Sequence, residues 1–234
     1  MPRSITPPLL ALALLLLAPR ARAQDLTDVE ITRRLGFIER HLEAGTVAAD
    51  RWWYGWYGGW TALTVGEVVF AIAAPSRGFR VDSAVGAVSC SLGVIPLGLF
   101  PFVPRTAAAS LRAVPGVTRE EKRRKLATAE RLLRTSAETE ALGRSWLPHT
   151  LGIGVSVAAG LILALGYQRP VTGTINILAG IALTEAQIFT QPTAAIGAWR
   201  AYGLGRFETP VAATNTPRWT IVPQPTGIGF AAVF

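Results

Sequence analysis

Four long apolar stretches constrain this chain more than any other feature of its sequence. They cover residues 54–74, 84–103, 146–165 and 171–190. Each has about the 20 residues that an α-helix needs to cross a hydrocarbon core of ~30 Å. Charged residues make up only 16% of the chain, whereas a soluble domain carries roughly a quarter. We therefore predict an all-α integral membrane protein, a helical bundle of about four hydrophobic helices within residues 52–206.

The first 23 residues have the pattern of a removable export signal. Arg3 precedes an apolar run over residues 9–18, which is too short to cross a membrane, and a small-residue cleavage site ends at Ala23. We expect cleavage after Ala23, which places the mature N-terminus at Gln24, outside the cytoplasm. The alternative is an uncleaved anchor, which leaves the same residues outside.

Residues 24–51 predict an amphipathic N-terminal helix. Thr27 and Glu30 have the spacing of a capping box, in which each side chain bonds a free backbone amide of the helix start. A narrow apolar stripe follows, made of Ile31, Leu35, Ile38 and Leu42. Such a stripe must be covered by the bilayer surface, by the rest of the chain or by a second copy. The sequence leaves these three arrangements open.

A cluster of aromatic residues precedes the first apolar stretch. Four tryptophans and two tyrosines fall within residues 52–60. Amphipathic rings collect where hydrocarbon meets water, so we expect an aromatic belt. A stacking platform for a sugar, a base or a quaternary amine is the alternative.

Residues 118–142 predict a charged extramembrane helix that opens with a second capping box, Thr118 and Glu121. It either lies on anionic headgroups or forms a solvated linker. The surrounding loop, residues 104–145, holds ten basic and five acidic residues. The positive-inside rule favours such a loop in the cytoplasm, whereas four crossings place it outside. A re-entrant second stretch, kinked by Pro96, would leave three crossings and a cytoplasmic tail.

Small residues recur at four-residue intervals in the last two apolar stretches. The third stretch carries Gly152, Ser156, Gly160 and Ala164, and the fourth carries Thr172, Asn176, Gly180 and Thr184. Ridges of small residues let two helix backbones approach closely, so we predict a tight antiparallel hairpin with hydrogen bonds from Asn176 and the threonines. We also expect a bulky residue at Gly160 to destabilise the protein far more than one at Leu163.

Residues 207–234 predict an extended, proline-rich tail that is irregular or forms a short β-hairpin from residues 218–222 and 228–234. The last eight residues begin with alternating small and bulky residues and end in Phe234, which resembles the final strand of bacterial outer-membrane β-barrels. Barrel strands are about ten residues long, whereas residues 52–200 form helix-length blocks. We therefore expect the bacterial inner membrane.

Three ionisable residues are candidates for chemistry. Glu67 and Glu185 fall inside apolar stretches, where a carboxylate is costly and often forms a proton or cation site. The alternative is a structural role, in which each glutamate either lies near a lipid headgroup or is neutral and hydrogen-bonded to a neighbouring group. His149 opens the third stretch and, with a carboxylate, could act as acid and base in a membrane enzyme.

The sequence contains no metal-ligand spacing and no catalytic or nucleotide-binding motif, so we expect no metal and no cofactor, and a membrane-embedded enzyme is the weakest of the functional alternatives. The net charge of the chain is +8, and its basic residues lie beside membrane-length segments. This favours anionic membrane lipids over nucleic acid as partners. The leading expectation is a structural or accessory envelope component that contacts a second copy or another envelope protein. A small transporter or channel component using Glu67 and Glu185 is the alternative.

Overall fold

The computed structural model describes residues 26–208, 218–224 and 227–233 of the 234-residue chain. The expected signal peptide, residues 1–23, lies outside the described residues. In chain order the elements are α2 (Asp28–Ala73), α3 (Arg77–Leu99), η1 (Val103–Arg105), α4 (Ala107–Arg112), α5 (Arg119–Gly143), α6 (Trp146–Leu161), the π-helical turn η2 (Ile162–Gly166), α7 (Pro170–Phe189), α8 (Ala194–Gly203), β1 (Arg218–Gln224) and β2 (Gly227–Val233).

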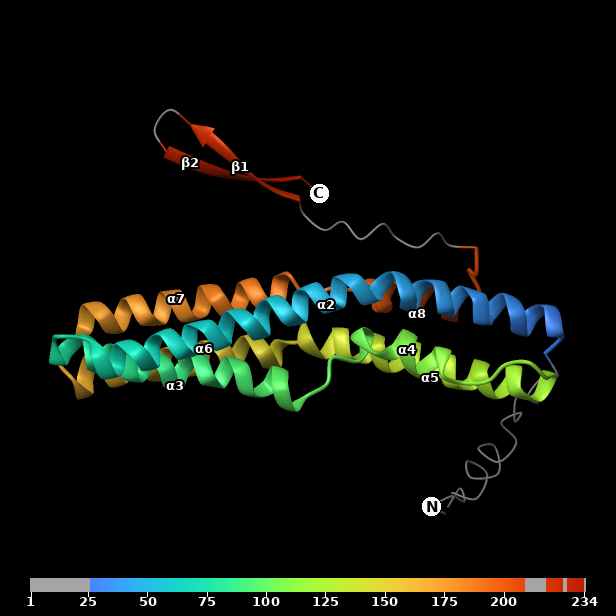
Figure 1. The fold of residues 1–234 in the computed structure, drawn as a ribbon, viewed down its shortest axis with the longest axis horizontal. Coiled ribbons are helices and arrows are strands. Elements are labelled where there is room, and N and C mark those ends of the chain that lie inside the picture. The colour runs from blue at the N-terminus through green and yellow to red at the C-terminus, as the bar shows by residue number, and fades with distance from the viewer. Residues whose placement is uncertain (1–25, 209–217, 225–226, 234) are drawn as a thin grey trace, which may run out of the picture.

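The helices form an elongated bundle, and α2 runs along its whole length (Figure 1). Its 46 residues correspond to about 69 Å of helix. Thr27 caps its start by accepting a hydrogen bond from the Glu30 amide at 3.2 Å, and the helix ends just before Pro75, which cannot continue it. One unbroken helix therefore covers both the expected N-terminal helix and the first apolar stretch.

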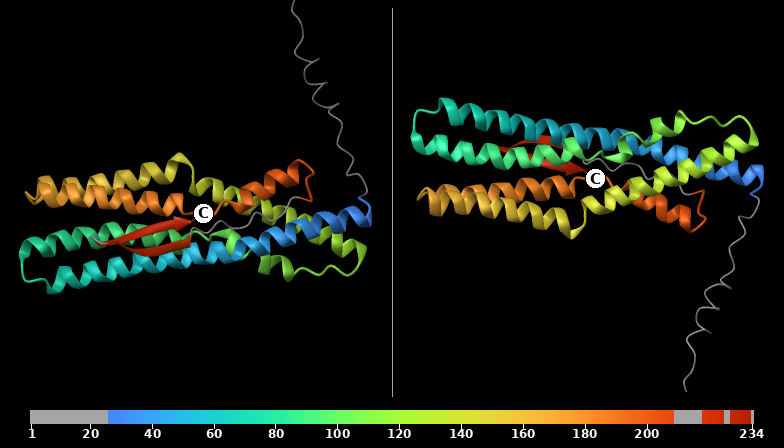
Figure 2. Two further views of the ribbon diagram at one scale, coloured as in Figure 1. Left: turned by 90° about the horizontal axis from the view of Figure 1, so that it is seen from above. Right: turned by 90° about the horizontal axis from the view of Figure 1, so that it is seen from below.

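The other helices pack along α2 in two groups. The C-terminal half of α2 lies with α3, α6 and α7, whereas its N-terminal half lies with α4, α5 and α8 (Figures 1 and 2). We call the first group the apolar half and the second group the head. α5 continues almost without interruption into α6, so a second column also connects the two groups.

The head has a hydrophobic core like that of a soluble protein. The apolar stripe of α2 lies in this core, where Ile31 and Ile38 are fully buried and Leu42 is 4% exposed. The core is completed by residues from α4, α5, α8 and the segment after α8: Ala107, Ala108, Leu111, Leu126, Ala129, Leu133, Ala198, Tyr202 and Phe207. The stripe is thus covered by the rest of the chain.

Ion pairs join the acidic residues of the N-terminal half of α2 to basic residues on α4, α5 and the segment before α4. The pairs are Asp28 with Arg119 at 2.9 Å, Glu39 with Lys125 at 2.7 Å, Glu43 with Arg112 at 3.4 Å and Asp50 with Arg105 at 2.9 Å. Exposed pairs contribute little stability, so their main effect is on the alignment of the helices. The basic helix α5 therefore packs along α2 in the direction of the bundle axis.

The apolar half has the opposite pattern, because its large side chains point outward. Leu99, Leu165 and Val171 are each about 70% exposed, and Trp60 and Leu163 are among the few large buried side chains. Among the described residues, three helical columns are long and apolar enough to cross a membrane: Arg77–Leu99, Arg119–Gly166 and Pro170–Gly203. The apolar part of the second column is α6 with η2. These columns indicate a membrane protein. The first expected crossing, residues 54–74, lies in the C-terminal half of α2, which is not among the three.

Small residues form the contact between α6 and α7. A Cβ atom added to Gly152 would lie 2.2 Å from Cγ2 of Thr184, and one added to Gly180 would lie 2.6 Å from Oγ of Ser156. A Cβ atom on Gly160 would similarly meet the carbonyl oxygen of Gly173 at 2.6 Å. These three positions therefore leave no room for a side chain.

The first turns of α7 depart from the expected ridge. Gly173 and Ile177 face Gly160, whereas Thr172 and Asn176 were expected there. The reason is geometric, because a strict four-residue interval advances about 40° per step around an α-helix and leaves the contact face after two or three steps.

A second seam of this kind, which the sequence interpretation missed, joins α2 to α3. Gly93 lies against the indole of Trp60, and Gly86 lies against the carboxyl group of Glu67. α3 is a regular 23-residue helix beside α2, with Pro96 close to its C-terminal end. Its length and position differ from those of a short re-entrant segment.

The last helical column is interrupted after α7. Helix α7 stops at Phe189, and the next helix, α8, begins at Ala194. Near the C-terminus β1 pairs antiparallel with β2, with Arg218 opposite Val233 and Gln224 opposite Gly227.

We predict that Gly160→Leu destabilises the protein by more than about 2 kcal/mol, because the new side chain must push α7 away. The measurement is reversible unfolding in mixed detergent micelles. Leu163 is unsuitable as the comparison site because it is fully buried. Gly154 lies on the same helix with open space around it, so Gly154→Leu is the matched control. Equal losses at both glycines would contradict the close contact.

Candidate functional site

The structure brings together two of the three candidate residues. Nδ1 of His149 lies 2.9 Å from Oε1 and 2.8 Å from Oε2 of Glu185. His149 is in the first turn of α6 and Glu185 is near the end of α7. Because the helices are antiparallel and Gly152 meets Thr184, the next turn of α6 towards the head faces Glu185. The contact is therefore a consequence of the small-residue ridge.

This imidazole and carboxylate are each about one quarter exposed, and the ring of Phe189 lies 5.8 Å from the imidazole. A carboxylate fixes the orientation of an imidazole and stabilises its charged form, which is useful in proton transfer. The same contact also gives the carboxylate a partner in an apolar setting, where a lone charge is costly. Within the described part of the chain, no group of three or more His, Cys, Asp or Glu side chains could hold a metal ion.

Glu67 does not join this pair. Its carboxyl group packs on Gly86 of α3, whereas Glu185 contacts α6. Trp60 and Gln187 are bonded and so lie at the same level of the bundle. Glu67 lies seven residues beyond that level on α2, away from the head. Glu185 lies two residues from that level on the antiparallel helix α7, in the same direction. The two residues are therefore separated along the bundle axis by roughly 7 Å. The two carboxyl groups therefore belong to different helix pairs.

The aromatic cluster of α2 is used for hydrogen bonds between helices. Nε1 of Trp52 donates to the carbonyl oxygen of Gln187 at 3.0 Å, and Nε1 of Trp60 donates to Oε1 of the same glutamine at 2.9 Å. Nε1 of Trp56 donates to Oγ1 of Thr190 at 3.0 Å. The three indoles follow each other at four-residue intervals along one side of α2, a signal that the sequence interpretation overlooked.

Trp53 points to the neighbouring helix instead. Its Nε1 donates at 3.1 Å to the carbonyl oxygen of Leu97. This carbonyl has no helical partner because Pro101, four residues later, lacks an N–H group. The guanidinium group of Arg105 lies over the ring of Trp53, 3.8 Å from the ring centre, in a cation–π contact. Asp50 forms an ion pair with the same guanidinium group at 2.9 Å. This side of the cluster thus joins α2 to α3 and to the segment that follows it.

A third group of polar contacts lies where α5, α7 and α8 meet. Glu140 is only 1% exposed, and its Oε2 accepts a hydrogen bond from the Ile196 amide at 3.0 Å. Burial raises the pKa of this carboxyl group from 4.5 to about 7. The sequence interpretation treated α5 as a surface helix and missed this residue, because its burial depends on α8.

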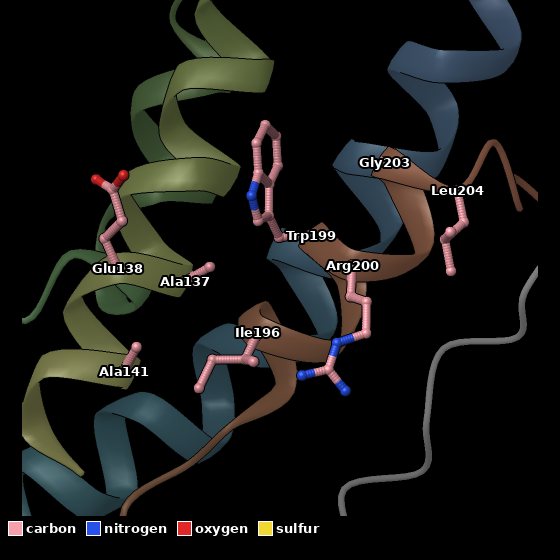
Figure 3. Close-up of a pocket in the computed structure, with 8 residues that line it drawn as sticks. All are labelled: Ala137, Glu138, Ala141, Ile196, Trp199, Arg200, Gly203 and Leu204. Carbon is pink, nitrogen blue, oxygen red and sulfur yellow. The ribbon is translucent and has the colours of Figure 1, made fainter. Parts of the chain in front are cut away.

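A shallow groove lies between α5 and α8 (Figure 3). Its volume is about 540 Å³, and Ala137, Ala141, Ile196, Trp199 and Arg200 are among its lining residues. Neither His149 nor Glu67 is among the lining residues.

A scan against protein-family models, a search of curated proteins and a search of solved structures each found no match to this chain.

We predict that Trp60→Phe lowers the free energy of unfolding by about 1–2 kcal/mol, because it removes the bond to Gln187 and underfills the space over Gly93. The measurement is again reversible unfolding in mixed micelles. Trp146 is 74% exposed, so Trp146→Phe is the control and should change the stability by less than about 0.5 kcal/mol. A similar loss from both substitutions would show that the bond at Trp60 is unimportant.

Proposed function

We propose that this chain is a non-catalytic integral protein of the bacterial envelope that acts as a structural or accessory component. Its apolar half anchors it in the inner membrane and keeps the head at a fixed distance from the bilayer. The observation that carries the proposal is the unbroken helix α2, which extends from the head into the apolar half; α5 and α6 form a second column beside it that is interrupted only at residues 144–145. The polar side chains of the apolar half support this role because they bond one another between helices: Trp60 bonds Gln187, and Glu185 bonds His149.

We place the head outside the cytoplasm, with four crossings formed by the C-terminal half of α2, α3, α6 with η2, and α7. A three-crossing arrangement puts the N-terminal half of α2 and the basic helix α5 on opposite sides of the membrane. Their ion pairs, such as Asp28 with Arg119 and Glu39 with Lys125, favour one side for both. The export-type residues 1–23 favour the outer side.

The charge of the short turns at the far end of the bundle also fits this orientation. Arg77, Arg80 and Arg169 lie there with a single acidic residue, Asp82, which bonds Arg169 at 2.6–2.7 Å. The positive-inside rule acts most strongly through short loops next to crossings, and these turns would face the cytoplasm. In the head, the N-terminal half of α2 carries five acidic and three basic residues, so it offsets two of the five net positive charges of residues 104–145.

We predict that the protein stays in the membrane pellet after salt and alkaline washes and leaves it only with detergent. Reporter fusions after Arg112 and at the C-terminus should both give an extracytoplasmic signal. Release by alkali would contradict membrane anchoring. A cytoplasmic signal after Arg112 would contradict the orientation, while leaving the anchoring intact.

The contact between His149 and Glu185 favours one alternative, a small transporter that moves protons through this pair. Under the leading proposal, purified protein in liposomes should carry no proton flux above that of empty vesicles. A flux that is lost in Glu185→Gln and kept in Glu138→Gln would favour the transporter, because Glu138 is an exposed residue of the head.

A further inference from the structure

Three of the helical columns are interrupted at the same level of the bundle, where the head meets the apolar half. The gaps are residues 100–106 between α3 and α4, residues 144–145 between α5 and α6, and residues 190–193 between α7 and α8. α2 alone crosses this level without a break (Figure 1). We call this level the joint. Helix ends leave backbone amides and carbonyls without helical partners, so a joint of this kind needs other polar groups.

The last turn of α5 supplies many of these groups. Nε2 of Gln191 donates to the carbonyl oxygen of Glu140 at 2.9 Å. A nitrogen of the Arg144 guanidinium donates to the carbonyl oxygens of Phe189 at 2.7 Å and Gln191 at 2.9 Å. Oε2 of the Glu140 carboxyl group accepts from the Ile196 amide in the first turn of α8. One turn of α5 therefore binds both the end of α7 and the start of α8.

The groups around the Glu140 carboxyl oppose one another. Burial disfavours its charged form, while the amides of Ile196 and Ala195 and the charge of Arg144 favour that form. Arg144 comes from the same helix, α8 presents backbone amides, and the link between α7 and α8 presents the uncharged Gln191. The effect of burial is the largest of these.

We propose that Glu140 is a proton-controlled latch at the joint: its neutral form keeps α8 docked on α5, and its ionised form lets α8 separate. This inference goes beyond anchoring, because it gives the head a conformational response to the pH on its own side of the membrane. Separation of α8 would also widen the groove of Figure 3, since Ala137, Ala141 and Ile196 line it next to the latch.

The direction of the response follows from the two states. In the docked state the carboxyl group has a pKa of about 7, whereas in an opened, hydrated state it returns towards 4.5. The docked state is therefore most favoured below pH 4.5. This advantage is lost as the pH rises to 7, because the opened state then binds fewer protons. The difference corresponds to an increase in opening on the order of 100-fold.

The test is amide hydrogen exchange of the full-length protein in nanodiscs at pH 5.5 and pH 8, corrected for the intrinsic pH dependence of exchange. Amides of α8 should lose protection by roughly 10- to 100-fold at the higher pH. Amides of α4, which also pack in the head core, should not. In Glu140→Gln the loss in α8 should disappear, whereas Glu138→Gln, two residues earlier on α5 at the exposed edge of the groove, should keep it.

Two results would overturn the latch. One is an α8 response in Glu140→Gln equal to that of the wild type, and the other is an equal pH response of α4 and α8 in the wild type. The second comparison needs no variant, so it decides the matter even if Glu140→Gln folds poorly.

Discussion

In the proposed membrane arrangement, one helix, α2, meets two different solvents along its length, and the arrangement of the other helices follows from this. Its N-terminal half turns an apolar stripe inward and its charges outward, as water requires. Its C-terminal half turns Trp60 and Glu67 towards neighbouring helices and exposes Val65 and Ile72, as lipid allows. Since the helix is unbroken, the side chains of both halves are fixed relative to one another.

The two halves are stabilised by different interactions for the same reason. In the head, side chains such as Phe37 and Leu133 leave water completely, and hydrophobic burial contributes most of the stability. Within lipid there is no such gain between helices, so close packing and hydrogen bonds must replace it. The glycines of α3, α6 and α7 provide the close packing, and the Trp60 bond to Gln187 is one of the hydrogen bonds.

Features that depend on a few neighbouring residues could be predicted from the sequence. The caps at Thr27 and Thr118 are such features: both threonines accept the expected amide bond, although only Thr118 forms the reciprocal box, because the Glu30 carboxylate pairs with Arg34 instead. The ridge of Gly152 and Gly160 was readable from spacing, but its partners on α7 shift to Gly173 and Ile177, because the helical repeat is 3.6 residues and not four.

Features that depend on distant segments were not predictable in the same way. Glu140 lies on a helix rich in charges, and only the docking of α8 distinguishes it from its exposed neighbour Glu138. The pair of His149 and Glu185 is an intermediate case. Each residue was a candidate by itself, and their contact would have followed from extending the α6–α7 register by one turn. The continuity of α2 was hidden by glycines and aromatic residues that usually mark a helix end or an interface.

Those glycines bear on how the head is connected to the membrane. Gly55, Gly58 and Gly59 lie near the joint. Their neighbours show this, because Trp53 bonds Leu97 near the end of α3 and Trp56 bonds Thr190 just after α7. Added Cβ atoms at these three glycines would meet open space, so packing does not require them. Each glycine costs a helix up to about 1 kcal/mol relative to alanine. Helix α2 therefore resists bending least at the joint, where the other three columns are already interrupted. The polar contacts of Glu140, Arg144 and the tryptophans are what oppose a tilt of the head there.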